Sequence, residues 1–163
     1  MQLPAVPPDG VRVLCRVEFA LQQVGHGRGL EARTRLAGPL HPHLEKTVRT
    51  DFDLGDYETA CFAAMKAVEV AIRDASGLDN SLVGVALMRK AFQPHQNGKP
   101  GGPLADAGEQ EAESALFAGA MDRYKNPSSH RTVDFADLIE AAQIIQFADL
   151  LLRQVDRARA RNS

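Results

Sequence analysis

The stretch from residue 134 to about residue 159 constrains the fold most, because it carries the longest uninterrupted helical pattern in the chain. Asp134 can cap this helix, and apolar residues recur at helical spacing along one face. That face holds Leu138, Ala142, Ile145, Ala148, Leu152 and Val155. Phe147 and Leu151 make a second side apolar, which is more surface than one small bundle can cover. We therefore expect the second face, together with the small residues around Gly119, to form a homodimer contact.

The same periodicity predicts a fold made of helices. For the strongest of them, Asp56 is a favourable N-cap and Gly77 a favourable stop. The expected helices cover residues 10–24, 42–50, 56–76, 81–92, 109–125 and 134–159. Residues 93–107 contain three glycines and three prolines, so a loop or a small hairpin is expected there. Because no alternating segment demands a sheet, the fold class is predicted to be all-α, a helical bundle.

The chain is expected to divide near residue 39. Residues 25–39 are rich in glycine and arginine, a composition that predicts a mobile linker. Residues 1–39 are thus interpreted as an N-terminal extension, a helix followed by that linker. Residues 40–163 are interpreted as the helical domain, which is long enough to bury one core.

Composition limits the classes of protein and site that fit. A formal net charge of −2 gives no general attraction to nucleic acids, so RNA binding would need a local patch. Cys15 and Cys61 are too few for a disulfide framework or a zinc site, and His41 and His43 give little support to a metal site. We expect no cofactor. No apolar run reaches the roughly 20 residues that span a bilayer, so a cytoplasmic protein without membrane contact is expected.

Residues 122–132, DRYKNPSSHRT, place cations, an amide and an imidazole at a helix break. They can be a simple turn, since Asn-Pro-Ser-Ser is favourable turn chemistry and Arg123 and Lys125 suit the C-terminal end of a helix dipole. They can also cleave an RNA phosphodiester. The His130 imidazole can transfer protons near neutral pH, and a guanidinium holds phosphate through parallel donors. The spacing alone leaves both interpretations open.

Several segments together resemble a known family. They are LHPHLEKTVRTDFDLGDYETACFAAMKAVEVAIRDASGL, GVALMRKAF, LFAGAMDRYKNPSSH and the final apolar helix. The most specific element is F-x-G-A, then a basic residue and N-P-x-x-H, here Phe117, Gly119, Ala120, Lys125, Asn126, Pro127 and His130. From about Leu40 to Val155 the chain resembles the bacterial and phage family of hypothetical Ymh proteins, which belongs to the broader HEPN superfamily.

The resemblance implies a four- or five-helix bundle that is commonly dimeric, and many HEPN domains are endoribonucleases. Their signature is an arginine, four to six further residues and a histidine, with a polar residue often directly after the arginine. His130 matches the histidine and Asn126 the polar residue, but Lys125 stands where the family usually has arginine. Arg123 satisfies the loosest spacing. The family pattern thus favours Lys125 as the functional cation, whereas guanidinium geometry favours Arg123.

The function expected from the resemblance is a metal-independent endoribonuclease, in phage defence or a toxin–antitoxin-like system. His130 would be the general acid or base, Arg123 and Lys125 would hold the phosphate, and Asn126 would orient the site. Arg131 and Arg157 are further candidate RNA contacts. The alternative is a non-catalytic RNA- or protein-binding dimerisation module in a larger defence assembly. An antitoxin or defence-system protein is a possible partner in either case.

Overall fold

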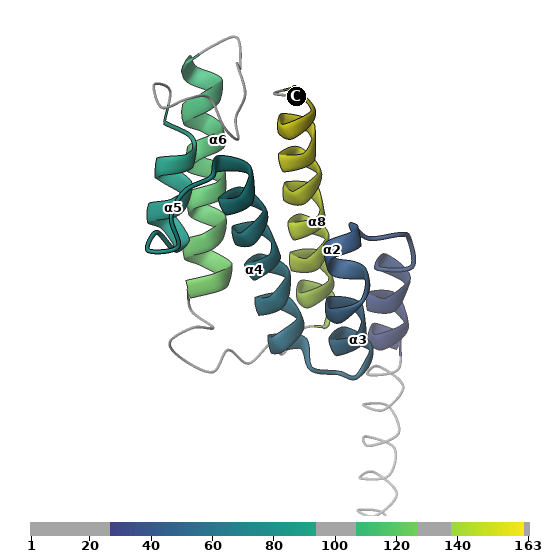
Figure 1. Ribbon diagram of the computed structural model, residues 1–163. Coiled ribbons are helices and arrows are strands. Elements are labelled where there is room, and N and C mark those ends of the chain that lie inside the picture. The colour runs from purple at the N-terminus through teal and green to yellow at the C-terminus, as the bar shows by residue number, and fades with distance from the viewer. Residues whose placement is uncertain (1–26, 94–106, 127–137, 162–163) are drawn as a thin grey trace, which may run out of the picture.

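The computed structural model describes residues 27–93, 107–126 and 138–161, and these residues form helices without a strand (Figure 1). The prediction of an all-α fold is confirmed. After a first helix at residues 27–35 come α2 (Pro42–Glu45), α3 (Thr47–Asp53), α4 (Tyr57–Ser76), α5 (Gly84–Ala91), α6 (Ala107–Ala120), the π-helical turn η1 (Met121–Lys125) and α8 (Leu138–Arg161).

Helices α4 and α8 form the centre of the bundle and run side by side in the same direction (Figure 1). The Cys61 thiol donates to the Ala141 carbonyl at 3.7 Å near one end, and Arg159 donates to the Ala71 carbonyl at 2.9 Å near the other. The fully buried side chains between them include Met65, Val68, Ile72, Ile145 and Leu152. Burying one such side chain stabilises a fold by about 1.5–3 kcal/mol, so this pair contributes most of the core.

The ends of α4 lie where its sequence predicts them. The Asp56 carboxylate accepts from the Thr59 backbone N–H at 3.1 Å, and Gly77 ends the helix with a φ of +66°. The next start differs from the prediction. The Asp79 carboxylate accepts from the Ser81 N–H at 2.8 Å in a turn, which delays α5 until Gly84.

The interpretation of residues 25–39 as a mobile linker is wrong for the part that the structure describes. Residues 27–35 are helical, and Ala32 and Leu36 are 1% and 3% exposed. Arg49 of α3 donates to the carbonyls of Leu36 and Gly38 at 2.5 and 2.8 Å. Burial and these hydrogen bonds outweigh the local preference of the glycines. The helix expected at residues 10–24 lies outside the described residues.

The second apolar side of α8 is covered largely by the chain itself. Ile144 and Leu151 are 4% and 0% exposed, and Phe147 is half-buried with its ring 6.0 Å from that of Tyr124. Leu151 is therefore not a homodimer contact, and that part of the prediction is wrong. The sequence pattern predicts two apolar sides correctly, but helices on both sides of α8 already cover them (Figure 1). No helix among the described residues is long and apolar enough to cross a membrane.

Candidate functional site

The candidate site begins where α6 ends, in the π-helical turn η1. The Asn126 N–H donates to the carbonyl of Met121, which is the i→i+5 pattern of a π-helix. Such turns occur frequently at functional sites. Along this turn Tyr124 contacts Phe147 of α8 and Lys125 contacts Glu69 of α4. The turn thus connects the predicted motif to both central helices.

Lys125 is one member of a buried cluster of charges. Its ammonium lies 2.5 Å from one oxygen of Glu69, and the Arg73 guanidinium lies 2.9 Å from the other. The Glu69 side chain is 6% exposed and that of Lys125 is 14% exposed. Arg73 also donates to the carbonyl of Leu82 at 2.9 Å, which links the cluster to the segment before α5. The Glu69 carboxylate therefore joins α4 to η1, and Arg73 joins the same cluster to the approach to α5.

The electrostatics of Glu69 follow from these partners. Burial by itself raises the pKa of this carboxyl. The hydrogen bonds from Lys125 and Arg73 together lower the pKa by more than burial raises it, so the net shift is downward. Glu69 is thus held as a carboxylate with a cation on each side. A lysine in such a pair has much of its charge offset before any ligand arrives.

Glu69 and Arg73 lie four residues apart on α4, a spacing at which charged side chains usually pair on a solvated face. Here they do pair, but Glu69 is 5% exposed and is not solvated. A signal was present, because Glu69 lies four residues after Met65 and three before Ile72, both of which belong to the apolar stripe. An acidic residue at that spacing indicates a buried carboxylate with a partner elsewhere in the chain.

Arg123 has a different environment from Lys125. It is exposed, its guanidinium lies 5.6 Å from the centre of the Tyr124 ring, and it forms no ion pair with a described residue. The two cations of the motif therefore divide into one that is buried and paired and one that remains available to an anion.

Asn126 connects the turn to α5. Its amide donates to the Asp122 carboxylate at 3.1 Å. A Cβ atom at Gly84, the first residue of α5, would lie 3.4 Å from the Asn126 amide oxygen, and Gly84 has a φ of +54°. The polar residue of the motif is thus held between the end of α6 and the start of α5.

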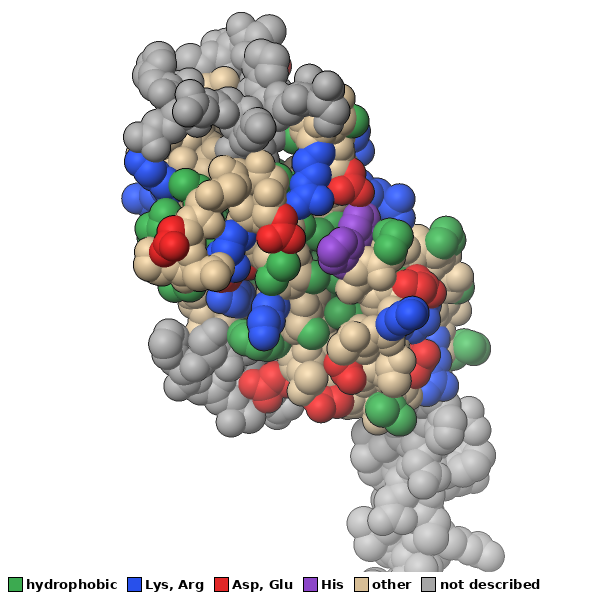
Figure 2. Space-filling view, in the orientation of Figure 1, with side chains coloured by type: hydrophobic (Ala, Val, Ile, Leu, Met, Phe, Trp, Pro, Cys, Tyr) green, Lys and Arg blue, Asp and Glu red, His purple; other side chains and the backbone are tan. Residues whose placement is uncertain are grey.

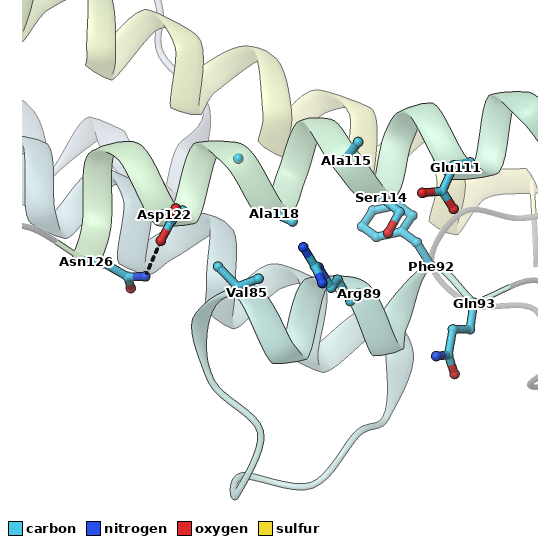
Figure 3. Close-up of a pocket in the computed structure, with 11 residues that line it drawn as sticks. Val85, Arg89, Phe92, Gln93, Glu111, Ser114, Ala115, Ala118, Asp122 and Asn126 are labelled. Atoms are coloured by element: carbon cyan, nitrogen blue, oxygen red, sulfur yellow. Dashed lines mark hydrogen bonds between the residues drawn. The ribbon is translucent and has the colours of Figure 1, made fainter.

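A groove of about 860 Å³ runs from Asn126 along the contact between α5 and α6 (Figure 3). Its walls are formed by Val85, Arg89, Phe92 and Gln93 on the α5 side and by Glu111, Ser114, Ala115, Ala118, Gly119, Asp122 and Asn126 on the α6 side. The small residues that predicted a close helix contact thus form one wall of a groove.

The remaining predicted site residues are His130, Arg131 and Arg157. His130 and Arg131 lie outside the described residues. Arg157 is exposed on α8, ten residues beyond Phe147, which is about 15 Å along the helix axis. Of the predicted residues, the described part of the chain therefore brings together Arg123, Lys125 and Asn126.

Comparison with known proteins identifies the family of the chain but finds no characterised protein in which the site could be examined. A model of the family described as "Protein of unknown function (Hypoth_ymh)" matches residues 38–155. The chain belongs to this family. No curated protein and no solved structure matches it. The resemblance to Ymh proteins, expected from about Leu40 to Val155, is thus confirmed over nearly the same range.

In this Hypoth_Ymh family member the histidine pair at residues 41 and 43 has a structural explanation. His41 is 6% exposed, its Nε2 lies 2.8 Å from an oxygen of Asp156, and its Nδ1 accepts from the His43 N–H at 3.3 Å. Both ring nitrogens are therefore engaged, and they tie the start of α2 to α8. The described residues contain no group of three or more ligands suited to a metal ion.

The charged side chains are mixed on the face drawn in Figure 2. Basic and acidic side chains alternate there, without gathering into a broad basic surface among the described residues. Cys61 is not a reactive group, because burial raises the pKa of its thiol to about 12. The chemistry of the described residues is thus concentrated at η1 and in the adjoining groove.

Proposed function

We propose that this Hypoth_Ymh family member is a metal-independent endoribonuclease of the HEPN type. The observation that supports this most is the position of Arg123. It is exposed, carries no ion pair with a described residue, and stands three positions before Asn126, the first residue of the N-P-x-x-H sequence. An available guanidinium, with an amide and an imidazole close to it in the sequence, is the set of groups that RNA cleavage without a metal requires.

In this proposal the 2′-hydroxyl of one nucleotide attacks the adjacent phosphorus and the bond to the leaving 5′-oxygen breaks. The products are a cyclic phosphate and a 5′-hydroxyl. His130 acts as the general base that takes the 2′-hydroxyl proton or as the general acid that protonates the leaving oxygen. Arg123 stabilises the charge that develops on the phosphate.

The roles of the two cations are divided accordingly. The sequence favours Lys125 as the functional cation, but its pairing with the buried Glu69 supports a positioning role instead. Lys125 fixes the end of η1, five residues before His130 in the sequence. Asn126, held by Asp122, orients the site.

We propose in addition that the protein acts as a homodimer, in a phage-defence or toxin–antitoxin-like setting with a possible partner protein. Because Leu151 is buried, the contact on α8 is limited to what that helix leaves exposed, including Leu150 and the outer edge of Phe147, and the exposed face around Gly119 remains part of the proposed contact. Leu150 is 48% exposed. Sedimentation of the Leu150→Glu variant tests this contact, since a dimer should become a monomer.

A non-catalytic binding module is the second candidate. The observation in its favour is the Lys125–Glu69 pair, which removes one of the two cations from contact with phosphate. The ribonuclease would cut RNA, whereas the binding module would leave it intact.

Incubation of the purified protein with labelled RNA and EDTA separates them. The ribonuclease proposal expects cutting that is lost in His130→Ala and reduced by orders of magnitude in Arg123→Ala, with cyclic phosphate ends on the products. Cutting that persists in His130→Ala contradicts the assigned site. Intact RNA at high protein concentration supports the binding module.

A further inference from the structure

The groove between α5 and α6 contains polar groups that the proposed cleavage does not use. Arg89 extends from α5 into the middle of the groove, Asp122 and Asn126 lie at one end, and Glu111 lies toward the other (Figure 3). Among the described residues, neither Arg89 nor Glu111 forms an ion pair or hydrogen bond, and Asp122 bonds only to Asn126. Opposite charges thus line one groove without neutralising each other.

The balance of charge indicates which part of an RNA molecule fits there. One guanidinium faces two carboxylates, so the groove carries no excess of positive charge for the phosphate backbone. Its donors and acceptors instead resemble those that read the edges of unstacked bases in single-stranded RNA. The exposed Ala115, with the small parts of Phe92 and Ala118 that reach the groove wall, provides apolar contact for the face of a base.

We propose that this groove is a subsite that binds a guanine base of the RNA substrate, an inference that rests on the proposed function. Guanine presents two acceptors, O6 and N7, along one edge and two donors, N1–H and N2–H, along another. The parallel donors of Arg89 match the first edge, and a carboxylate matches the second. Adenine, cytosine and uracil lack this combination of paired acceptors and paired donors.

Asp122 is assigned as the carboxylate because of its position. It lies one turn before Asn126 and bonds to it, so a base held by Asp122 would lie next to the cleavage site. Glu111 lies eleven residues earlier on the same helix, which is about 16 Å away along the axis. The groove therefore determines which nucleotide stands beside the scissile bond.

Binding of short RNA by the full chain tests the assignment without requiring cleavage. The His130→Ala protein is titrated with labelled decamers of uridine that carry one central guanosine, adenosine or cytidine, and binding is followed by fluorescence anisotropy. The guanosine decamer should bind about tenfold more tightly than the others. Arg89→Ala and Asp122→Asn should each remove this preference, whereas Lys90→Ala, the neighbouring cation outside the groove, should retain it.

Modified bases assign the individual contacts. Replacing guanosine by inosine removes the N2 amino group and should weaken binding. This loss of affinity should be absent in Asp122→Asn. Replacing guanosine by 7-deazaguanosine removes the N7 acceptor and should also weaken binding. This loss of affinity should be absent in Arg89→Ala. Thermal unfolding of each variant checks that the fold is retained.

The outcomes distinguish the two proposals. Preference for guanosine without cleavage of any RNA supports the subsite and contradicts the ribonuclease. Cleavage that ignores the base, or a preference that survives both groove variants, contradicts the subsite alone. A change in oligomeric state caused by Arg89→Ala or Asp122→Asn would assign the groove to a contact between copies of the chain, which also overturns the subsite.

Discussion

The bundle contains two helix pairs that differ in how completely side chains fill the space between the helices. Helices α4 and α8 enclose side chains such as Met65, Ile72 and Ile145, which have no exposed surface. Helices α5 and α6 also share buried side chains, with the rings of Phe92 and Phe117 4.9 Å apart, but they leave a groove along one side. The first pair buries its facing surfaces, and the second leaves polar side chains along an open groove.

The difference comes from side-chain size and position. The buried faces of α4 and α8 combine large apolar side chains such as Met65 and Ile145 with alanines such as Ala64, and all of these are fully buried, so little space remains between the helices. On α6 the middle of the groove wall is formed by Ala115, Ala118 and Gly119, whose side chains are too small to fill the groove. Short side chains on one wall thus leave the space into which Arg89 extends.

Truncation of a core side chain should have the largest effect on the free energy of unfolding. Met65→Ala should lower the free energy of unfolding by about 2–5 kcal/mol, because it leaves a cavity in a filled core. Val85→Ala, at the half-buried edge of the groove, should cost less than about 1 kcal/mol. Urea unfolding measures both values, and equal losses would mean that the two pairs are packed alike.

Removing Lys125 should have the next largest effect. Lys125→Met leaves Glu69 buried with Arg73 as its one remaining cation in the cluster, at a cost of about 3 kcal/mol. Lys66→Met, an exposed lysine on α4, is the matched control and should change stability by less than about 0.5 kcal/mol. If Lys125→Met is as stable as its control, the buried cluster does not anchor η1.

Gly84→Ala tests the contact between α5 and the motif. A left-handed φ costs a residue with a side chain about 1–2 kcal/mol, and the new methyl group would lie 3.4 Å from the Asn126 amide oxygen. Stability should fall by that amount, and RNA binding should weaken with it. Gly77→Ala has a similar φ but no neighbour within 4 Å, so it should lose stability and leave RNA binding unchanged.

The dependence of stability on pH should show the smallest effect. The pKa of Glu69 is below its ordinary value of 4.5 in the folded protein, so its contribution is complete above about pH 4.5 and is lost as the pH falls toward the folded pKa. The difference in unfolding free energy between the natural protein and Glu69→Gln should therefore be constant near neutral pH and shrink below pH 4.5. A difference that grows on acidification would mean that the carboxylate is not stabilised by its cations.

Local signals predicted much of the fold. Asp56 and Gly77 act within their own turns, so both ends of α4 were predictable from sequence. The helix at residues 27–35 was not, because its stability depends on Arg49 and on burial of Ala32 and Leu36, which arise only when the chain is folded. The composition of that segment indicates its local preference, and the tertiary contacts override it.

The candidate site was predictable only in part for the same reason. Residues 122–126 stand out in the sequence, and the structure gathers them at η1. The partner of Lys125 is 56 positions earlier in the chain, and no local pattern joins it to Glu69. The groove depends on α5 lying beside α6, so Arg89 and Asp122 carry no signal in sequence that relates one to the other.

Arg49 sets a practical boundary for anyone who shortens this protein. The family match begins at residue 38, yet two of the carbonyls that the Arg49 guanidinium binds belong to Leu36 and Gly38. A version starting at residue 40 would keep almost all of the shared family sequence. It would also leave that guanidinium without two acceptors and remove Ala32 and Leu36 from the interior. The segment that the family shares and the segment that packs as a unit therefore begin at different residues. Expression of the domain should start no later than residue 27.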